Sequence, residues 1–278
     1  MTLNSNTIIY EPEPIPYICV LTLLRLDLLK RFIDSIDHPV NRVVILFQGN
    51  IDKNKVNFNN RFVKEFVFIS ASMNIGVSRG WNYFVKNFPS SYWLISGDDC
   101  YFEPNTLEHI AKFMSIPSSL ENVFCGLKIK NRNEAPAEFN TFVITKLLLQ
   151  NVGLFDENIY PAYYEDNDLW HRIELTKQKV ATIDNAYINS GDSKHTGSCT
   201  LNSVHSTYRK KMNECYTLNE KYYKTKWNVG EKNAFSCPFN NPKFSIKNHR
   251  IAHVNYFKNQ KILLGHTSAP VFTYLSTI

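Results

Sequence analysis

The sequence has no long apolar run. Its longest apolar stretches, residues 17–24 and 43–47, fall well short of the ~18 residues that a membrane-spanning helix needs. Residues 1–16 also lack the basic start and apolar block of a secretion signal, so we interpret them as a loose leader before the first strand. These absences exclude a bilayer-spanning helix and predict a cytoplasmic protein, while leaving peripheral contact with a membrane surface open.

Paired cysteines and repeats are missing as well. The six cysteines are scattered without a CxxC motif, which argues against a cysteine-based zinc site and favours reduced thiols. The chain has no internal repeat, low-complexity tract or Gly/Ser-rich linker. Its 278 residues, of which 44% are hydrophobic, therefore predict one large domain with a sizeable core and an extension in contact with it.

The positive charge is unevenly distributed. Residues 205–278 carry 12 Lys/Arg against 3 Asp/Glu, whereas residues 1–204 carry 19 against 22. A basic C-terminal segment attracts nucleic acid, an anionic membrane surface or a phosphorylated substrate, and a solvated basic surface is the simplest alternative. Charge alone does not separate these partners.

Apolar strand-like runs alternate with amphipathic helical patterns in the first 120 residues. The runs are residues 18–23, 42–47, 66–70 and 92–96, and between them apolar residues recur at spacings of three and four. This alternation predicts an α/β fold whose central, mostly parallel sheet is flanked by helices and binds ligands beyond the carboxyl ends of its strands. Residues 251–278 alternate apolar and polar side chains and predict additional edge strands.

An acidic pair, Asp98 and Asp99, follows the fourth predicted strand. Two carboxylates at the tip of a buried strand raise one another's pKa unless a cation lies between them. Mg²⁺ and Mn²⁺ typically bind one or two carboxylates together with substrate phosphate oxygens. The pair is therefore a candidate site for a divalent metal ion, although an acidic turn by itself is a common feature.

A second acidic cluster, Glu165, Asp166 and Asp168, opens a predicted helix. Carboxylates in a first helical turn are favoured by the helix dipole and by free backbone N–H groups, which offsets part of their mutual repulsion. We expect Asp168 to pair with Arg172 four residues later, a contact typically worth a few tenths of a kcal/mol (~0.2–0.5). The alternative is an exposed acidic helix start with no chemical role.

The motifs in their order resemble nucleotide-sugar-dependent glycosyltransferases of the GT-A fold, particularly the large family 2. The matching segments are ICVLTLLR, SMNIGVSRGWN, WLISGDDCYFEP, GLFDENIYPAYYEDNDLWHRI and the histidine in SKHTGS, which together span residues 17–200. The resemblance implies a Rossmann-like catalytic domain over residues 1–204, with residues 205–278 packed on it as a basic, aromatic-rich extension. It also implies an inverting transfer of a sugar from a nucleotide diphosphate to an acceptor hydroxyl.

By the resemblance, Asp99 and His195 are the expected ligands of Mn²⁺ or Mg²⁺. The chain departs from the family's DxD pattern, because Gly97 stands where the first acid would be and Asp98 is left for a ribose or outer contact. Asp166 matches the family's catalytic base, and Glu165 is expected to orient the acceptor hydroxyl.

The resemblance also suggests a set of donor-binding residues. The turn after the second predicted strand reads Gln-Gly-Asn, where relatives often have an acid that reads uracil. We keep a uridine diphosphate sugar as the favoured donor, with thymidine or guanosine diphosphate sugars as alternatives. The expected donor contacts are Thr22, Arg25, Gln48, Asn74, Gly76, Arg79, Asn82 and Asp98.

The acceptor side is less defined by sequence. A glycan, lipid-linked or protein hydroxyl fits the implied chemistry. Five aromatic residues either stack against a sugar acceptor or belong to the buried core: Phe155, Tyr160, Tyr163, Tyr164 and Trp170. Lys226 and Trp227 are expected to cover the acceptor side or contact a partner. The competing functions are a nucleotidyltransferase-like enzyme, for which a glycine-rich phosphate loop is missing, and a nucleic-acid-binding module that stacks bases on the tyrosines of the basic extension.

Overall fold

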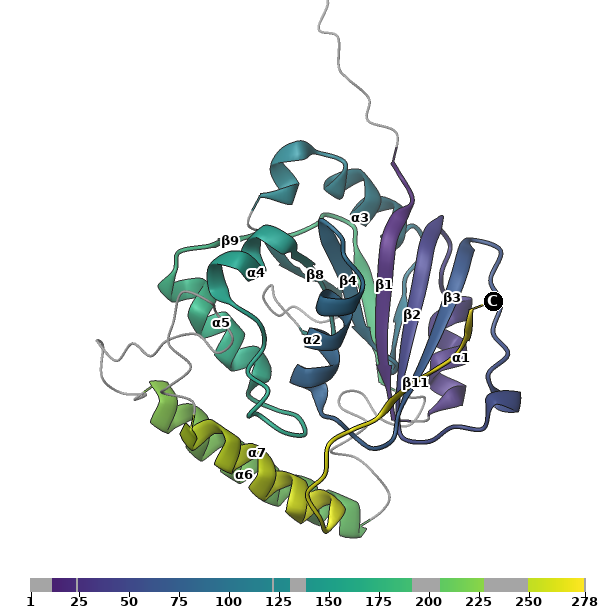
Figure 1. The fold of residues 1–278 in the computed structure, drawn as a ribbon. Helices are drawn as coiled ribbons and strands as arrows, with labels where there is room; N and C mark the ends of the chain where they lie inside the picture. Colours follow the sequence, from purple (N-terminus) through teal and green to yellow (C-terminus); the bar gives the residue numbers. More distant parts are fainter. Residues whose placement is uncertain are drawn as a thin grey trace, which may run out of the picture.

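The computed structural model describes residues 12–23, 25–121, 123–130, 139–191, 206–227 and 250–277. Within these residues the main sheet has eight strands in the order β11-β3-β2-β1-β4-β8-β6-β9, and helices lie on its faces (Figure 1). A second sheet has the order β5-β10-β7. The predicted α/β fold class is confirmed.

Four parallel strands form the centre of the main sheet. They are β1 (Ile15–Thr22), β2 (Val40–Gln48), β3 (Val63–Ala71) and β4 (Tyr92–Gly97), and each contains one of the four runs predicted from sequence, except that β1 ends one residue earlier than expected. Antiparallel strands flank them on both sides, with β8 next to β4 and β11 next to β3. The other strands are β5 (Cys100–Phe102), β6 (Val123–Gly126), β7 (Lys128–Ile129), β8 (Thr141–Thr145), β9 (Lys179–Val180), β10 (Tyr187–Ser190) and β11 (Phe272–Thr277).

Helices connect these strands and cover the sheet. Their bounds are α1 (Leu26–Asp34), α2 (Val77–Asn87), α3 (Thr106–Met114), α4 (Lys146–Val152), α5 (Glu165–Leu175), α6 (Ser206–Trp227) and α7 (Arg250–Leu264), with short 3₁₀ turns η1 (Lys53–Lys55) and η2 (Pro117–Leu120). Over the described residues, none of the helices is both long enough and apolar enough to cross a membrane.

Both faces of the sheet are buried, which explains the unbroken apolar runs. Along β1, Ile18 and Val20 pack into the core on one face, together with Phe32 of α1, while Cys19 and Leu21 pack into the core on the other face. A strand that alternates between two cores reads as continuous hydrophobic sequence, as in other parallel sheets covered by helices.

The last part of the chain differs from the edge strands predicted for it. Residues 250–264 form α7, which packs antiparallel against α6, and β11 then pairs with β3 at the edge of the main sheet (Figure 1). The strand prediction is therefore right for β11 and wrong for α7. In the part of α7 whose burial is described, residues 255–264, the buried residues follow helical spacing, and three of the four carry polar side-chain atoms: Tyr256, Asn259, Gln260 and Leu263.

A buried ionic network joins α5 to the end of α6. Asp168 is fully buried and contacts Arg172 at 2.9 Å on one oxygen and Lys226 at 2.7 Å on the other. Lys226 also reaches Asp156 at 2.7 Å, and Trp227 donates its indole N–H to Asp168 at 2.7 Å. Two positive groups thus balance two negative ones within a region closed to water.

This network corrects the expectation of a weak surface pair between Asp168 and Arg172. The pair exists, but both side chains lie in the core, where an unpaired charge costs several kcal/mol. Burial alone would raise the pKa of Asp156, yet the ammonium of Lys226 lowers it below its ordinary value. Lys226 and Trp227 therefore join the extension to the body of the protein instead of facing a partner.

We expect Lys226→Met to lower the free energy of unfolding by about 3–5 kcal/mol, because it leaves Asp156 and Asp168 buried with one cation between them. Lys224→Met is the matched control, since Lys224 lies in the same turn of α6 in an exposed pair with Glu220. Urea unfolding at pH 7 measures both variants. Equal, small losses would show that the network does not hold α6 in place.

Candidate active site

The carboxyl ends of β1, β2 and β4 bring several predicted residues to one edge of the sheet. In the strand register, Thr22 lies opposite Phe47, one residue before Gln48, and Leu21 lies opposite Gly97. Thr22, Gln48 and the Gly97 turn are therefore neighbours, as the α/β prediction requires.

Asp98 is half-buried at this edge, and its carboxylate oxygen Oδ2 is closed to solvent. Burial raises its pKa to about 7; the neighbouring Thr22 hydroxyl and Arg25 lower it, and Asp99 raises it further. Asp98 Oδ2 and Thr22 Oγ1 are both buried, and although the two groups lie close together, neither atom makes a hydrogen bond of normal geometry to a described residue. Buried polar atoms are nearly always paired in native proteins, so these two atoms indicate a place where a ligand completes the site.

Gly97 stands where the DxD pattern has its first acid. A Cβ at Gly97 would lie 2.9 Å from Asp99 Oδ1, so the Asp99 carboxylate is folded back over Gly97 and a larger residue there would require this carboxylate to move. The Asp99 carbonyl accepts hydrogen bonds from Gly191 N at 3.0 Å and Arg31 Nη2 at 3.1 Å. The backbone at Asp99 is thereby fixed from two sides.

Arg31 helps to hold the Asp99 turn in place, a role that was not predicted from the sequence. From α1 it binds the carbonyls of both Asp99 and Gly191 and lies over the Tyr101 ring at 4.6 Å. A lone arginine on an amphipathic helix looks like a surface residue, so no sequence signal marked it. Its contacts fix the start of the segment that leads to His195.

The predicted metal ligand His195 lies outside the described residues, which end at Gly191 on this side. In the described ranges no cluster of three or more His, Cys, Asp or Glu side chains is arranged to hold a metal ion. The two adjacent carboxylates nevertheless fit a hard divalent ion that takes its remaining ligands from water and substrate phosphate.

Gln48 and Asn74 shape the turn that leads into α2. Gln48 Oε1 accepts from the backbone N–H groups of Ile75 at 3.1 Å and Gly76 at 3.0 Å, and Asn74 Oδ1 also accepts from Gly76 at 2.9 Å. The side-chain oxygen of Gln48 is thus committed to the turn. A base contact through Gln48 would have to use the amide nitrogen, and that role stays a prediction.

Gly76 connects this turn to the loop before α5. Its φ of +82° favours glycine, and a Cβ there would meet Tyr160 Cδ2 at 2.8 Å. The next residue, Val77, donates its N–H to the Pro161 carbonyl at 2.7 Å, and Tyr160 donates its hydroxyl to the Asn74 carbonyl at 2.8 Å. The turn before α2 and the loop before α5 are therefore hydrogen-bonded directly to each other.

Two other predicted donor residues are used elsewhere. Asn82 is fully buried and exchanges hydrogen bonds with the backbone of Phe155 at 2.9 and 3.0 Å, while its amide nitrogen also reaches Glu157. These bonds give Asn82 a structural role, and the donor contact expected for it stays a prediction. Arg79 points toward α7, where its guanidinium donates to the Tyr256 hydroxyl at 3.3 Å.

The acidic pair Glu165 and Asp166 begins α5 behind two residues with left-handed backbone. Glu165 is 7% exposed; burial first, and then the adjacent Asp166, raise its pKa well above its ordinary value. Glu165 Oε2 is likewise buried without a hydrogen-bond partner among the described residues. Asp166 is half-buried, and burial raises its pKa although Asn167 N donates to its carboxylate at 2.8 Å. A carboxylate with a raised pKa is a stronger base.

The aromatic residues near this pair divide into two groups. Phe155 and Tyr160 are fully buried and belong to the core, as the alternative interpretation had it. Tyr163, Tyr164 and Trp170 are half-buried. Tyr222 donates its hydroxyl to Asp156, and Trp227 is 1% exposed, so these two rings of the extension are not available to stack on nucleic-acid bases.

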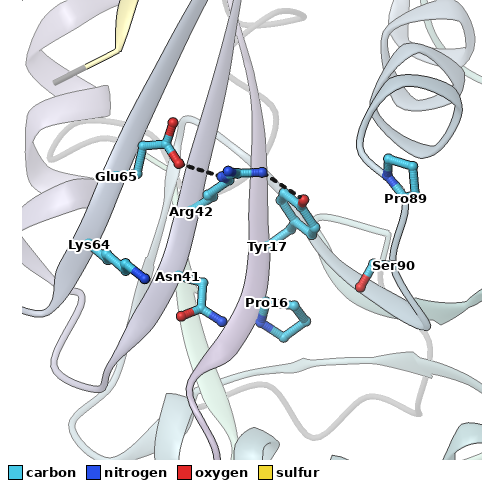
Figure 2. Close-up of a pocket in the computed structure, with 8 residues that line it drawn as sticks. All are labelled: Pro16, Tyr17, Asn41, Arg42, Lys64, Glu65, Pro89 and Ser90. Atoms are coloured by element: carbon cyan, nitrogen blue, oxygen red, sulfur yellow. Dashed lines mark hydrogen bonds and ion pairs between the residues drawn. The ribbon is translucent and has the colours of Figure 1, made fainter.

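A hollow of 370 Å³ lies at the other end of the sheet, as its lining residues show (Figure 2). It is lined by the first residues of β1, β2 and β3, and Arg42 bridges Glu65 and the Tyr17 hydroxyl across it. Ligands of parallel α/β sheets bind at the carboxyl ends of the strands. The hollow is therefore separate from the acidic site.

Comparisons with known proteins agree with this geometry. No family model matches the chain. A 61-residue stretch is 41% identical to a galactofuranosyl glycosyltransferase of Leishmania donovani, covering 19% of this chain and 14% of that protein. The structure is similar to a mannosyltransferase from Pyrobaculum calidifontis in complex with GDP-Man and Mn²⁺, at a TM-score of 0.54 and 13% identity, over 91% of this chain and 74% of that one.

A second structure of the same type is GalNAc-T7 with UDP, GalNAc and Mn²⁺, at a TM-score of 0.53 and 10% identity, over 89% of this chain and 55% of that one. Similarity at such low identity concerns the fold. The chain has the GT-A fold of glycosyltransferases, and the resemblance noted in the sequence is confirmed at that level.

We expect Glu165→Gln to stabilise the protein at pH 8 in the absence of ligand. The folded-state pKa lies above the unfolded value of about 4.3, so the stabilising effect of the protonated acid is complete below that value and is lost as the pH rises through the folded pKa. The variant does not titrate at this position, so its melting temperature should exceed that of the wild type at pH 8, with the difference shrinking toward pH 4.

The exposed Glu121 provides the matched control, and Glu121→Gln should change the melting temperature little at either pH. A difference for Glu165→Gln that is the same at pH 4 and pH 8 would contradict the buried, unpaired state of this carboxylate.

Proposed function

We propose that this protein is a metal-dependent, inverting glycosyltransferase that moves a sugar from a nucleotide diphosphate, with a uridine diphosphate sugar favoured, to a hydroxyl of a glycan, glycolipid or glycoprotein. The observation that carries the proposal is the set of hydrogen bonds between the turn next to Gln48 and the loop that leads into α5. The turn at Asn74 and Gly76 leaves the donor-side edge and binds directly to the loop that presents Glu165 and Asp166.

The comparisons support a nucleotide-sugar donor. The two solved structures contain a GDP or UDP compound with Mn²⁺, and the curated relative is named for transfer of a furanose sugar. The two structures differ in base and sugar. The choice of uridine therefore rests on the resemblance and on the side-chain amide of Gln48, which would hydrogen-bond a pyrimidine base.

Donor binding on this proposal uses the edge of the sheet. Asp99 and His195 would hold Mn²⁺ or Mg²⁺, which supplies positive charge against the departing diphosphate. Thr22 and Asp98, whose buried oxygens lack partners, would accept or donate hydrogen bonds to the ribose, and Arg25 lies close enough to Asp98 to affect its pKa.

Acceptor activation uses the start of α5. Asp166 would take the proton of the acceptor hydroxyl while that oxygen bonds to the anomeric carbon and the bond from this carbon to the diphosphate oxygen breaks. Burial raises the pKa of Asp166, which strengthens it as a base, and Glu165 would orient the same hydroxyl. A single displacement with one base inverts the anomeric configuration.

A screen of nucleotide sugars with and without Mn²⁺ tests the proposal. The wild type should show a metal-dependent melting shift and turnover with one donor. Asp99→Asn should lose the metal-dependent shift, whereas Asp166→Asn should keep donor binding and lose about 10²–10⁴-fold in kcat, the range for removal of a general base.

Asp184→Asn, at an exposed turn, is the control and should behave like the wild type. If wild-type protein neither binds nor turns over any nucleotide sugar with metal, or if Asp166→Asn turns over as fast as the control, the assignment fails.

A further inference from the structure

Four tyrosine rings gather beside the acidic pair from two distant segments. Tyr163 and Tyr164 precede α5, and Tyr216 and Tyr223 come from α6. The ring centroid of Tyr216 lies 5.7 Å from that of Tyr163 and 5.2 Å from that of Tyr164, and Tyr223 lies 5.5 Å from Tyr164. We call these four residues the tyrosine shelf.

Polar groups line the same surface. The hydroxyls of Tyr164 and Tyr216 are 3.3 Å apart, and the Glu220 carboxylate interacts with Tyr164. Glu220 also pairs with Lys224 at 2.7 Å. The shelf therefore combines aromatic faces with hydroxyl, carboxylate and ammonium groups, which is a surface for a ligand that is apolar on one face and rich in hydroxyls at its rim.

The backbone that presents the shelf is strained. Tyr163 and Tyr164 have φ values of +74° and +81°, a region that costs a bulky residue on the order of 1–3 kcal/mol. Asn219 of α6 holds this backbone, because its amide nitrogen donates to the carbonyls of Ala162 at 2.9 Å and Tyr163 at 3.3 Å. Such strain collects at functional sites, where surrounding contacts impose it.

The shelf continues directly into the proposed catalytic pair. Tyr164 precedes Glu165, and Glu165 Oε2 is buried without a partner in the described part of the chain. At the outer side, Tyr216 is 37% exposed. Tyr223 lies close enough to Asp166 for the charge of that carboxylate to raise the pKa of the tyrosine, after burial, Asp168 and Glu174. The shelf therefore extends from an exposed ring at Tyr216 to the neighbourhood of Asp166.

We propose that the tyrosine shelf is the acceptor subsite and binds the sugar rings of an oligosaccharide; this rests on the proposed function. The C–H face of a sugar ring packs on the electron-rich face of tyrosine, while its hydroxyls bond to phenol and carboxylate groups. The rings extend beyond the residue next to Glu165, so the acceptor is longer than one sugar.

The test compares Tyr216→Ala, Tyr216→Phe and Tyr223→Ala with Tyr187→Ala, a control on β10 whose 36% exposure matches that of Tyr216. With the donor identified in the screen and oligosaccharide acceptors, Tyr216→Ala and Tyr223→Ala should raise the KM for the acceptor about tenfold, as expected for loss of one aromatic contact. The KM for the donor should change less than twofold, and Tyr216→Phe, which keeps the ring, should restore most of the acceptor affinity.

Direct binding separates this inference from the proposed function. Labelled wild type and Tyr216→Ala are applied to an array of immobilised neutral oligosaccharides without donor or metal. Binding by the wild type that Tyr216→Ala loses supports the shelf even if no nucleotide sugar is turned over. The shelf is refuted if the wild type binds no oligosaccharide, if Tyr216→Ala binds as the wild type does, or if the variant raises the donor KM as much as the acceptor KM.

Discussion

The buried charge of Asp168 is the constraint on which the C-terminal half of this fold depends. A fully buried carboxylate requires a cation and hydrogen-bond donors, and the chain supplies them from its own helix through Arg172 and from α6 through Lys226 and Trp227. Because Lys226 also neutralises Asp156, one lysine joins two segments to the extension. The position of α6 is thereby set by electrostatics that packing of apolar side chains alone would not specify.

The position of α6 in turn fixes the loop before α5. Asn219 lies two turns before Lys226 and donates to the carbonyls of Tyr160, Ala162 and Tyr163, and Asn259 of α7 adds another bond to Tyr160. These contacts hold Tyr163 and Tyr164 in a strained backbone conformation that an unrestrained chain would not adopt. Catalysis by a carboxylate depends on such rigidity, since a base must lie within hydrogen-bond reach of the proton it removes.

The sequence predicted the layers of the fold better than the roles of its polar residues. Apolar runs marked β1 to β4 because burial on both faces leaves a continuous signal. The pattern failed for α7, whose buried face includes Asn259 and Gln260, since buried amides are read as exposed. Gln48 and Asn82 stand at positions expected to meet a ligand, yet an amide that caps a turn or bridges two loops has the same sequence signature as one that binds a nucleotide.

The aspartates and glutamates show what distinguishes the two kinds of polar residue. Asp156 and Asp168 are buried with cations at 2.7–2.9 Å, and they hold the fold together. Glu165 is also buried and Asp98 is half-buried, but each keeps a buried oxygen without a hydrogen-bond partner in the described chain, and burial raises their pKa. A fold that builds complete ionic networks a few residues away could have paired these acids too. Leaving them unpaired lowers stability, and that loss is explained if a donor, a metal ion or an acceptor hydroxyl supplies the missing partner.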